Sequence, residues 1–172
     1  MDGEHWLASC HPTPDAAYTQ WEQPPHLAEI PLGRRFDALR LPQMLGLTLL
    51  WELARDRSRI PVLEEHARPK PWIYVLAEPG TAEAWGTRRR QSGATILSAG
   101  DTLTVPSPLA DAITGVQRHH RYMWRTAPNG AGTLAASDDL ATALDRALDP
   151  DRQAERIRAA RAVFFKGRHR TD

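Results

Sequence analysis

The stretch GRRFDALRLP at residues 33–42 runs directly into the apolar sequence QMLGLTLLWEL at residues 43–53. Its glycine predicts a turn, and the apolar residues after it predict a short buried strand with Phe36 and Ala38 facing inward. Pro42 suits the first position of a helix. Residues 43–53 are apolar on nearly every side, which predicts a helix that is largely buried. The stretch therefore predicts a turn, a strand and a buried helix in succession.

Further helices and strands are predicted on both sides of this stretch. Thr13-Pro14-Asp15 has the residues of a helix start, and Pro24-Pro25 ends that helix. Ser137 is expected to cap an amphipathic helix at residues 138–148, and Pro150 separates it from a second helical stretch at residues 151–165. A helical turn is predicted at residues 81–85, and strands at residues 26–30, 61–65, 72–77, 94–98, 102–105 and 121–126. The glycine-aspartate pair at residues 100–101 predicts a hairpin between the two strands that flank it.

These elements do not alternate regularly as strand, helix, strand, which predicts an α+β fold. The sheet is expected to be mixed, with flanking helices and a helical C-terminal end. A chain of 172 residues suits one domain with a tail. We assign the domain to residues 5–148 and a basic C-terminal helix with a frayed tail to residues 149–172.

The composition of the chain limits the partners, the metal sites and the cellular location that we expect. The formal net charge of +1 does not require a polyanionic partner, so any nucleic-acid interface must arise from local clustering. Cys10 is the only cysteine, which excludes an intrachain disulfide and a cysteine-based zinc finger. No apolar run is long enough to span a bilayer and no signal pattern begins the sequence, so we expect a cytoplasmic protein without membrane contact. The glycine-rich residues 129–132 lack the pattern of a phosphate-binding loop, and no cofactor is expected.

Several short motifs occur in an order that resembles a known family. They are WLAS at residues 6–9, GRRFD at 33–37, the apolar helix, WIYVLA followed by EPGT at 72–81, GDTLTVPSP at 100–108 and RYMW at 121–124. In this order and spacing the chain resembles the primase-polymerase (prim-pol) domain of the archaeo-eukaryotic primase superfamily, in its short actinobacterial form. The resemblance covers residues 5–148 and implies a prim-pol-like fold.

Active members of that superfamily carry two acids one residue apart on the first strand, a histidine on a later strand and a third acid on a following strand. The acids bind divalent metal ions, which neutralise the triphosphate and align the attacking hydroxyl. The corresponding positions here are Arg40, Pro42, Trp72 and Thr95, none of which supplies the expected ligand. The resemblance therefore implies a dismantled polymerase site with no metal bound, in which Asp37 and Asp101 are the residual carboxylates.

Clusters of arginine are the candidate nucleic-acid contacts. Phosphate groups of DNA or RNA are bound largely by such side chains, although solvated loop arginines would give the same pattern. The residues are Arg34, Arg35, Arg88, Arg89, Arg90, Arg118 and Arg121. Tyr122 and Trp124 follow the last of them, as in single-strand binders. Their alternation also fits one face of a half-buried strand, and we favour the strand core for both rings.

Residues 151–166 combine basic and apolar side chains. Ile157, Arg161, Phe164 and Phe165 could form a face that binds a protein partner or a second copy of the chain. A basic arm on nucleic acid and a solvated amphipathic helix are the alternatives.

Three functions are compatible with these observations. The favoured one is a catalytically inactive prim-pol-like domain that binds nucleic acid, or a replication or defence partner, through arginine-rich edges. The second is a protein-interaction or scaffold module that uses the C-terminal helix. The third is a residual metal-dependent nucleotidyltransferase that uses Asp37 and Asp101.

Overall fold

The computed structural model describes residues 2–53, 59–85, 93–109, 121–155 and 158. The helices are α1 (Gly3–Ser9), α2 (Pro14–Glu22), α3 (Gln43–Glu52), α4 (Thr81–Trp85) and α6 (Ser137–Leu148). The strands are β1 (Leu27–Pro31), β2 (Asp37–Pro42), β3 (Val62–Glu65), β4 (Trp72–Ala77), β5 (Thr95–Leu97), β6 (Thr102–Pro106) and β7 (Tyr122–Thr126). The predicted α+β class is confirmed.

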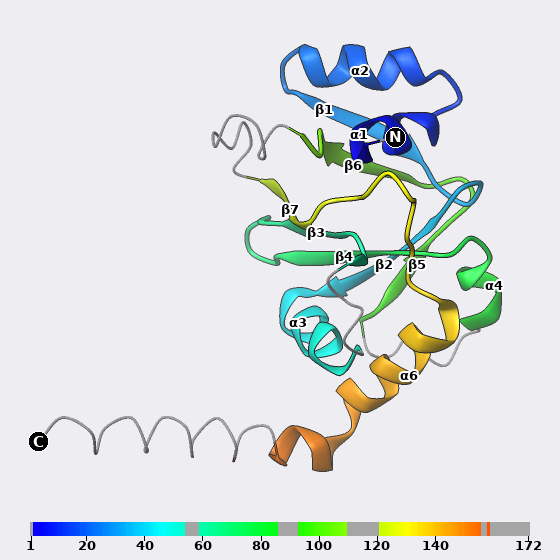
Figure 1. The fold of residues 1–172 in the computed structure, drawn as a ribbon. Helices are drawn as coiled ribbons and strands as arrows, with labels where there is room; N and C mark the ends of the chain where they lie inside the picture. Colours follow the sequence, from blue (N-terminus) through cyan, green and yellow to red (C-terminus); the bar gives the residue numbers. More distant parts are fainter. Residues whose placement is uncertain (1, 54–58, 86–92, 110–120, 156–157, 159–172) are drawn as a thin grey trace, which may run out of the picture.

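The strands form two antiparallel sheets. The larger has five strands in the order β5-β2-β4-β3-β7, and the smaller pairs β1 with β6. Figure 1 shows α3 and α6 below the five-stranded sheet, and the small sheet with α1 and α2 above it. Separate hydrophobic cores fill the two interfaces. Each strand of the large sheet therefore has one face toward the helices α3 and α6 and one face toward the small sheet.

The turn before β2 depends on Gly33. Its φ is +88°, and a Cβ at this position would lie 2.4 Å from the backbone nitrogen of Ala99. The N–H of Gly33 donates to the carbonyl of Phe36 at 2.8 Å, which closes the turn. Phe36 and Ala38 are fully buried, as predicted. Only glycine fits this site without displacing backbone, because L residues rarely adopt that φ.

The predicted burial of α3 is wrong on its outer side. Met44 and Trp51 are 74% and 69% exposed, whereas Leu49 is fully buried. The helix packs against α6 and approaches β4 at Gly46, whose hypothetical Cβ would lie 2.7 Å from the Cβ of Ile73. One side of α3 is thus covered, and the other faces outward.

The predicted hairpin at residues 100–101 is also wrong. The turn exists, since the N–H of Asp101 donates to the carbonyl of Ser98 at 2.9 Å. However, β5 pairs with β2 in the large sheet and β6 pairs with β1 in the small one. A turn signal reports only local backbone shape, whereas the partner of each strand is set by the packing of the two cores.

Helix starts differ from the sequence prediction in two places. The sequence did not predict α1, whose N-cap Asp2 accepts a hydrogen bond from the N–H of His5 at 2.8 Å. Ser137 was expected to cap α6, but the N-cap is Ala136, and the Ser137 hydroxyl is buried without a hydrogen bond among the described residues. The Asp2 cap therefore stabilises the start of α1, which hydrophobic periodicity alone did not indicate.

Helix α6 ends at Leu148 with Asp149 as its C-cap, and residues 150–155 are helical again. The predicted partner-binding residues Ile157, Arg161, Phe164 and Phe165 lie outside the described part of the chain. Within that part, no helix has the length and apolar character needed to cross a membrane.

Candidate functional site

The positions that the prim-pol resemblance assigned to the lost ligands lie together in the large sheet. Arg40 of β2 pairs with Thr95 of β5 on one side and with Tyr74 of β4 on the other. Pro42 pairs directly with Trp72. Since alternate residues of a strand share a face, Arg40 and Pro42 lie on the face that is turned toward the small sheet. Neighbouring strands thus bring together residues that are far apart in sequence.

Arg40 is the centre of this group. Its guanidinium carbon lies 3.9 Å from the centroid of the Trp72 ring and 6.0 Å from that of Tyr74. Its Nε is buried and has no hydrogen-bond partner in the described part of the chain. A guanidinium stays protonated and stacks well on aromatic faces. A fixed positive charge therefore occupies the place where the resemblance requires carboxylates.

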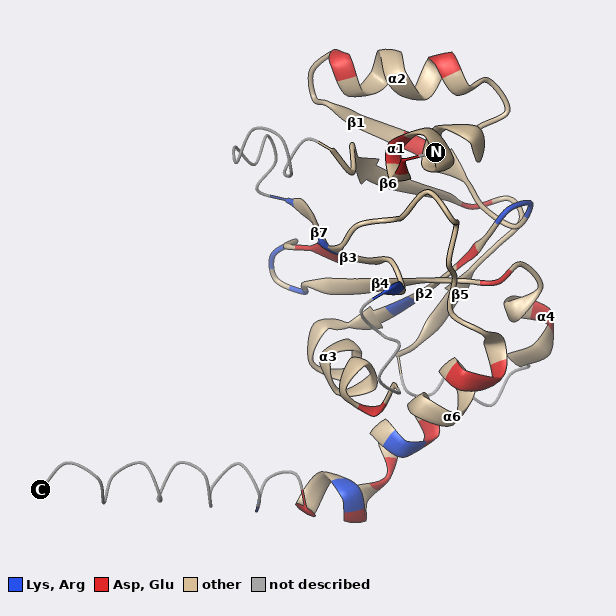
Figure 2. Cartoon of the chain, in the orientation of Figure 1, with Lys and Arg blue, Asp and Glu red and all other residues tan. Residues whose placement is uncertain are grey.

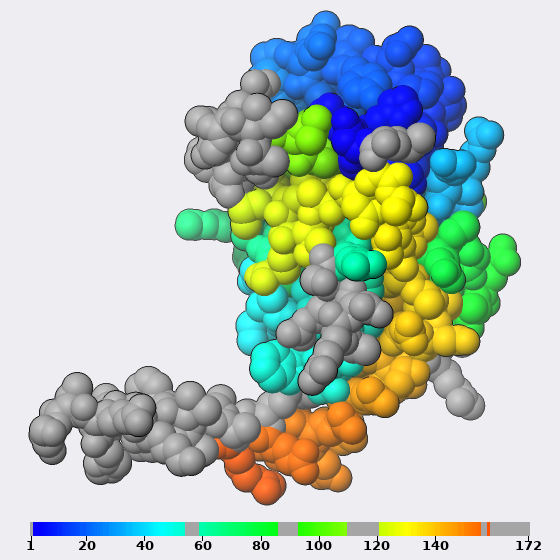
Figure 3. Space-filling view, in the orientation of Figure 1, coloured from blue at the N-terminus to red at the C-terminus, as the bar shows by residue number. Residues whose placement is uncertain are grey.

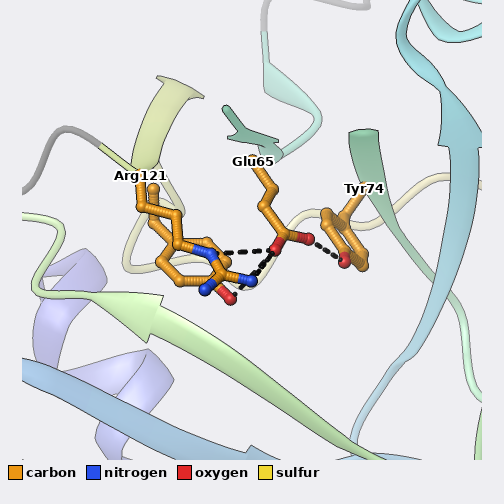
Figure 4. A network of polar contacts seen from close by, with 4 residues as sticks. Glu65, Tyr74 and Arg121 are labelled. Carbon is orange, nitrogen blue, oxygen red and sulfur yellow. Dashed lines mark hydrogen bonds and ion pairs between the residues drawn. The ribbon is translucent and has the colours of Figure 1, made fainter. Parts of the chain in front are cut away.

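Glu65, at the end of β3, collects hydrogen bonds on the same face (Figure 4). One carboxylate oxygen accepts from the Tyr74 hydroxyl at 2.6 Å. The other accepts from Nε and Nη2 of Arg121 at 3.1 and 2.8 Å, and from the Tyr122 hydroxyl at 3.2 Å. Glu65 itself is only 5% exposed, so this buried charge is stabilised by donors from β4 and from the start of β7.

The network shifts the acid–base properties of its members. Burial alone would raise the pKa of Glu65, but the hydrogen bonds from Tyr74, Arg121 and Tyr122 and the positive charge of Arg121 outweigh it and hold that pKa below its usual value. Burial and the hydrogen bond to Glu65 raise the pKa of Tyr74 far above its usual range. The carboxylate is therefore ionised and the phenol neutral at physiological pH.

Together these side chains form a strip across four strands. We call it the Arg40 strip and define it as Arg40, Trp72, Tyr74, Glu65, Tyr122 and Arg121. It combines three aromatic rings with two arginines and one carboxylate. Tyr74 and Glu65 are buried, whereas Arg40, Trp72 and Tyr122 are half-buried and Arg121 is exposed.

A basic depression lies at one end of the strip. It has a volume of about 310 Å³ and is lined by His66, Ala67, Arg68 and Arg121. The Arg121 side chain is 63% exposed there, although its Nε and Nη2 are bound to Glu65. His66 Nε2 lies 3.5 Å from the Glu64 carboxylate. Arg68 forms no ion pair with any residue in the described ranges.

The residual carboxylates face a different part of the molecule. Asp37 is fully buried; its oxygens accept from the Ser98 hydroxyl at 2.7 Å and from the N–H of Ala82 at 3.2 Å. Asp101 accepts from the N–H of Ser98 at 3.0 Å. Asp37 lies three residues before Arg40 and so on the opposite face of β2. Both acids are engaged in holding the turn at Ser98, and neither belongs to the Arg40 strip.

No group of three or more His, Cys, Asp or Glu side chains within the described ranges is arranged to hold a metal ion. The expected ligand positions on the strip offer a guanidinium, a proline, an indole and a threonine hydroxyl. These groups do not provide the oxygen donors that Mg²⁺ prefers.

The arginine clusters do not meet on one surface in the described part of the chain. Arg34 and Arg35 are exposed and line a separate depression of about 410 Å³ with Ser9, Cys10 and His11, among others. Burial raises the pKa of the Cys10 thiol, and Arg35 partly offsets this effect. Figure 2 shows the basic segment between β1 and β2 on the right and that between β3 and β4 on the left. Four other candidates, Arg88, Arg89, Arg90 and Arg118, lie outside the described residues.

The aromatic residues of β7 agree in part with the strand-core interpretation. Trp124 is 9% exposed, and its indole N–H donates to the carbonyl of Pro106 at 2.9 Å. Tyr122 is half-buried and contributes to the Glu65 network. The sequence analysis missed Glu65 and Tyr74 as site residues. The alternation of Trp72 and Tyr74 along the best predicted strand was the available signal for a shared face.

Comparison of the chain with family models, with curated proteins and with solved structures gives no match in any of the three.

Proposed function

We propose that this chain is a catalytically inactive prim-pol-like domain that binds single-stranded nucleic acid along the Arg40 strip. The observation that carries the proposal is the stacking of Arg40 on Trp72 at the meeting point of β5, β2 and β4. In the resemblance, this is where an active member would hold its metal ions. Here the same place offers an arginine and aromatic rings.

Charge and aromatic rings together favour a single strand as the ligand. Proteins that bind single strands combine basic side chains along the backbone with rings on which bases stack. Arg40 forms no ion pair in the described part of the chain, and Arg68 adds a second such charge at the end of the strip. Trp72 and Tyr122 are half-buried. The negative charge of Glu65 balances the positive charge of Arg121. Of the arginines in the strip and in the basic depression beside it, those without an ion pair among the described residues are therefore Arg40 and Arg68, at the two ends.

The same geometry argues against polymerase activity. Catalysis by two metal ions requires clustered carboxylates, and a guanidinium at Arg40 would repel a divalent cation. Asp37 faces away from the strip and both of its oxygens already accept hydrogen bonds. The inactive state is thus proposed from the chemistry of the side chains at the ligand positions.

Fluorescence anisotropy with labelled single-stranded DNA, single-stranded RNA and duplex DNA tests the binding. We expect both single strands to bind more tightly than the duplex, and affinity to fall linearly with salt on a log–log plot. Primer extension with Mn²⁺ and nucleotides should give no product. Absence of binding at low salt would overturn the proposal, as would primer extension that Asp37→Asn abolishes.

A further inference from the structure

The depression beside the turn at Gly33 is basic and shares no residue with the Arg40 strip. It has a volume of about 410 Å³ and is lined by the end of α1, the start of α2 and the turn that carries Arg34 and Arg35. Figure 3 shows this turn projecting at the right edge of the molecule, in light blue, beside the darker blue of α1 and α2. Three separate segments of the chain thus enclose one space.

The charges of both arginines in this turn are available to a ligand. Arg34 and Arg35 are exposed, and neither forms an ion pair with any residue in the described ranges. The backbone that carries them is held by the hydrogen bond from the N–H of Gly33 to the carbonyl of Phe36 at 2.8 Å. The turn therefore presents two adjacent guanidinium groups from a fixed backbone.

The polar side chains at the end of α1 are already engaged with the helix. The Ser9 hydroxyl and the Cys10 thiol both donate to the carbonyl of Trp6, at 2.6 and 3.4 Å. Burial raises the pKa of the Cys10 thiol, and the nearby Arg35 guanidinium lowers it in part. The thiol thus lies beside one of the two guanidinium groups, which supply the main donors of the depression.

The positive end of α2 borders the same space. Pro14 is the first residue of α2 and lines the depression, and the side chain of the N-cap Thr13 makes no capping hydrogen bond. A helix N-terminus carries a partial positive charge, which adds to that of the arginines. Asp15 is the acidic residue in this first turn; it is exposed and forms no ion pair with a described arginine.

These features favour a small ligand with a phosphate group. Guanidinium groups bind phosphate oxygens through paired N–H donors, and two cations match a phosphate monoester, whose charge is about −1.5 to −2 at pH 7. Small-molecule sites typically have volumes of about 300–1,000 Å³. No Trp, Tyr or Phe side chain is among the described residues that line the depression, so nucleic-acid bases would have no ring there on which to stack.

We infer that this depression binds phosphate monoesters, with Arg34 and Arg35 holding the phosphate group. The site goes beyond the proposed nucleic-acid function and does not depend on it. A phosphate group in the depression lies near Cys10, the only cysteine of the chain. The rate at which this thiol is alkylated therefore reports whether the site is occupied.

Isothermal titration of the full chain with inorganic phosphate and with glycerol 3-phosphate tests the inference. Both should bind saturably, and acetate should bind more weakly because it carries one charge. Arg34→Gln and Arg35→Gln should each weaken binding about tenfold, since each removes charge-assisted hydrogen bonds. Arg146→Gln, an exposed arginine on α6, should bind like the parent protein. Phosphate should slow the alkylation of Cys10 by iodoacetamide in the parent protein but not in Arg34→Gln/Arg35→Gln.

Binding of labelled single-stranded DNA separates this site from the Arg40 strip. Arg34→Gln/Arg35→Gln should bind the strand like the parent protein, and Arg40→Gln should retain phosphate binding. A parent protein that binds no phosphate, or a double variant that binds it equally well, would overturn the inference. Displacement of phosphate by single-stranded DNA would contradict it too, because the depression would then belong to the nucleic-acid surface. Loss of strand binding alone would overturn only the proposed function. The single variants decide if the double variant fails to fold.

Discussion

Arg40 and Glu65 lie on the same face of the sheet but in opposite electrostatic situations. Glu65 receives four side-chain hydrogen bonds and is almost completely buried. Arg40 is held by stacking, and its Nε has no hydrogen-bond partner in the described ranges. A buried carboxylate with saturated oxygens serves the stability of the fold, because leaving such a charge unpaired is costly. Arg40 is half-buried, and no carboxylate in the described ranges forms an ion pair with it. We therefore propose a structural role for Glu65 and, as part of the proposed function, a binding role for Arg40.

Replacement of Glu65 by Gln should lower the free energy of unfolding at pH 7 by about 1–3 kcal/mol, because hydrogen bonds to a charged acceptor are lost. The pKa of Glu65 is lowered in the folded chain. The stabilisation by its ionised form is therefore present above the unfolded pKa of about 4.3 and is lost as the pH falls through the folded value. Urea denaturation at a series of pH values should show the two proteins converging in acid.

The exposed Glu22 on α2 provides the matched control. Glu22→Gln should leave the unfolding free energy within about 0.5 kcal/mol of the parent protein at every pH. A Glu65→Gln deficit that persists unchanged at pH 3 would contradict the role of the charge and would indicate a purely steric effect.

The sequence could predict the neighbourhood of Arg40 but not that of Glu65. Arg40 follows a clear turn and lies in a strand with strong apolar flanks, so its position in the fold could be inferred from nearby residues. Glu65 depends on Arg121, which is 56 residues away in sequence. No local sequence pattern indicates a hydrogen bond between residues so far apart. This bond forms only because β3 and β7 pair at the edge of the sheet.

At the scale of elements, α3 is the clearest case of one sequence serving two environments. Its inner side approaches β4 so closely that Gly46 has room for no side chain, while its outer side exposes Met44 and Trp51. The apolar pattern predicted a helix correctly. It did not distinguish the side of the helix that is covered from the side that is exposed.

Gly46→Ala should destabilise the protein by up to about 2 kcal/mol. Alanine favours a helix by about 1 kcal/mol over glycine, but a Cβ at 2.7 Å from the Cβ of Ile73 must displace α3 from the sheet, and such overpacking costs about 1–3 kcal/mol. Chemical denaturation measures the change. Thr48→Ala on the same helix should have an effect of less than about 0.5 kcal/mol, and a stabilised Gly46→Ala protein would show that the close approach is wrong.

The limits of a strand were predicted correctly where prolines and glycines flank it in the sequence. The pairing of strands was predicted wrongly where the true partner lies far away in the sequence. The predicted limits of β4 match the structure, because Pro71 and the Pro79-Gly80 pair bound it in the sequence. The expected hairpin between β5 and β6 fails because each strand joins a different sheet. A sequence indicates that a strand exists more readily than it indicates which strand lies beside it.

At the scale of the whole molecule, two tryptophans connect the small sheet to its surroundings. The Trp21 indole on α2 donates to the carbonyl of Val105 at 3.1 Å, and that of Trp124 on β7 donates to Pro106 at 2.9 Å. Both acceptors are at the end of β6. This strand is thereby fixed between α2 and the large sheet, which positions the small sheet over one face of the domain.

Trp124→Phe should lower the free energy of unfolding by about 1–3 kcal/mol, because a buried carbonyl loses its donor. Denaturant unfolding should remain a single transition with an unchanged slope if the two sheets unfold together. Glu22→Gln at the exposed site on α2 is the control and should change stability by less than about 0.5 kcal/mol. Separate transitions for the two sheets would contradict a single cooperative unit.

The most direct test of the central claim is the salt dependence of single-stranded DNA binding by the full chain and by Arg40→Gln. The account predicts weaker binding by Arg40→Gln and a log–log salt slope smaller by about 0.7, as expected for the loss of one phosphate contact to a single strand. Arg146→Gln, an exposed arginine on α6, should match the parent protein in both quantities. Equal affinity and equal slope for the parent protein and Arg40→Gln would contradict the claim that the Arg40 strip is the binding surface.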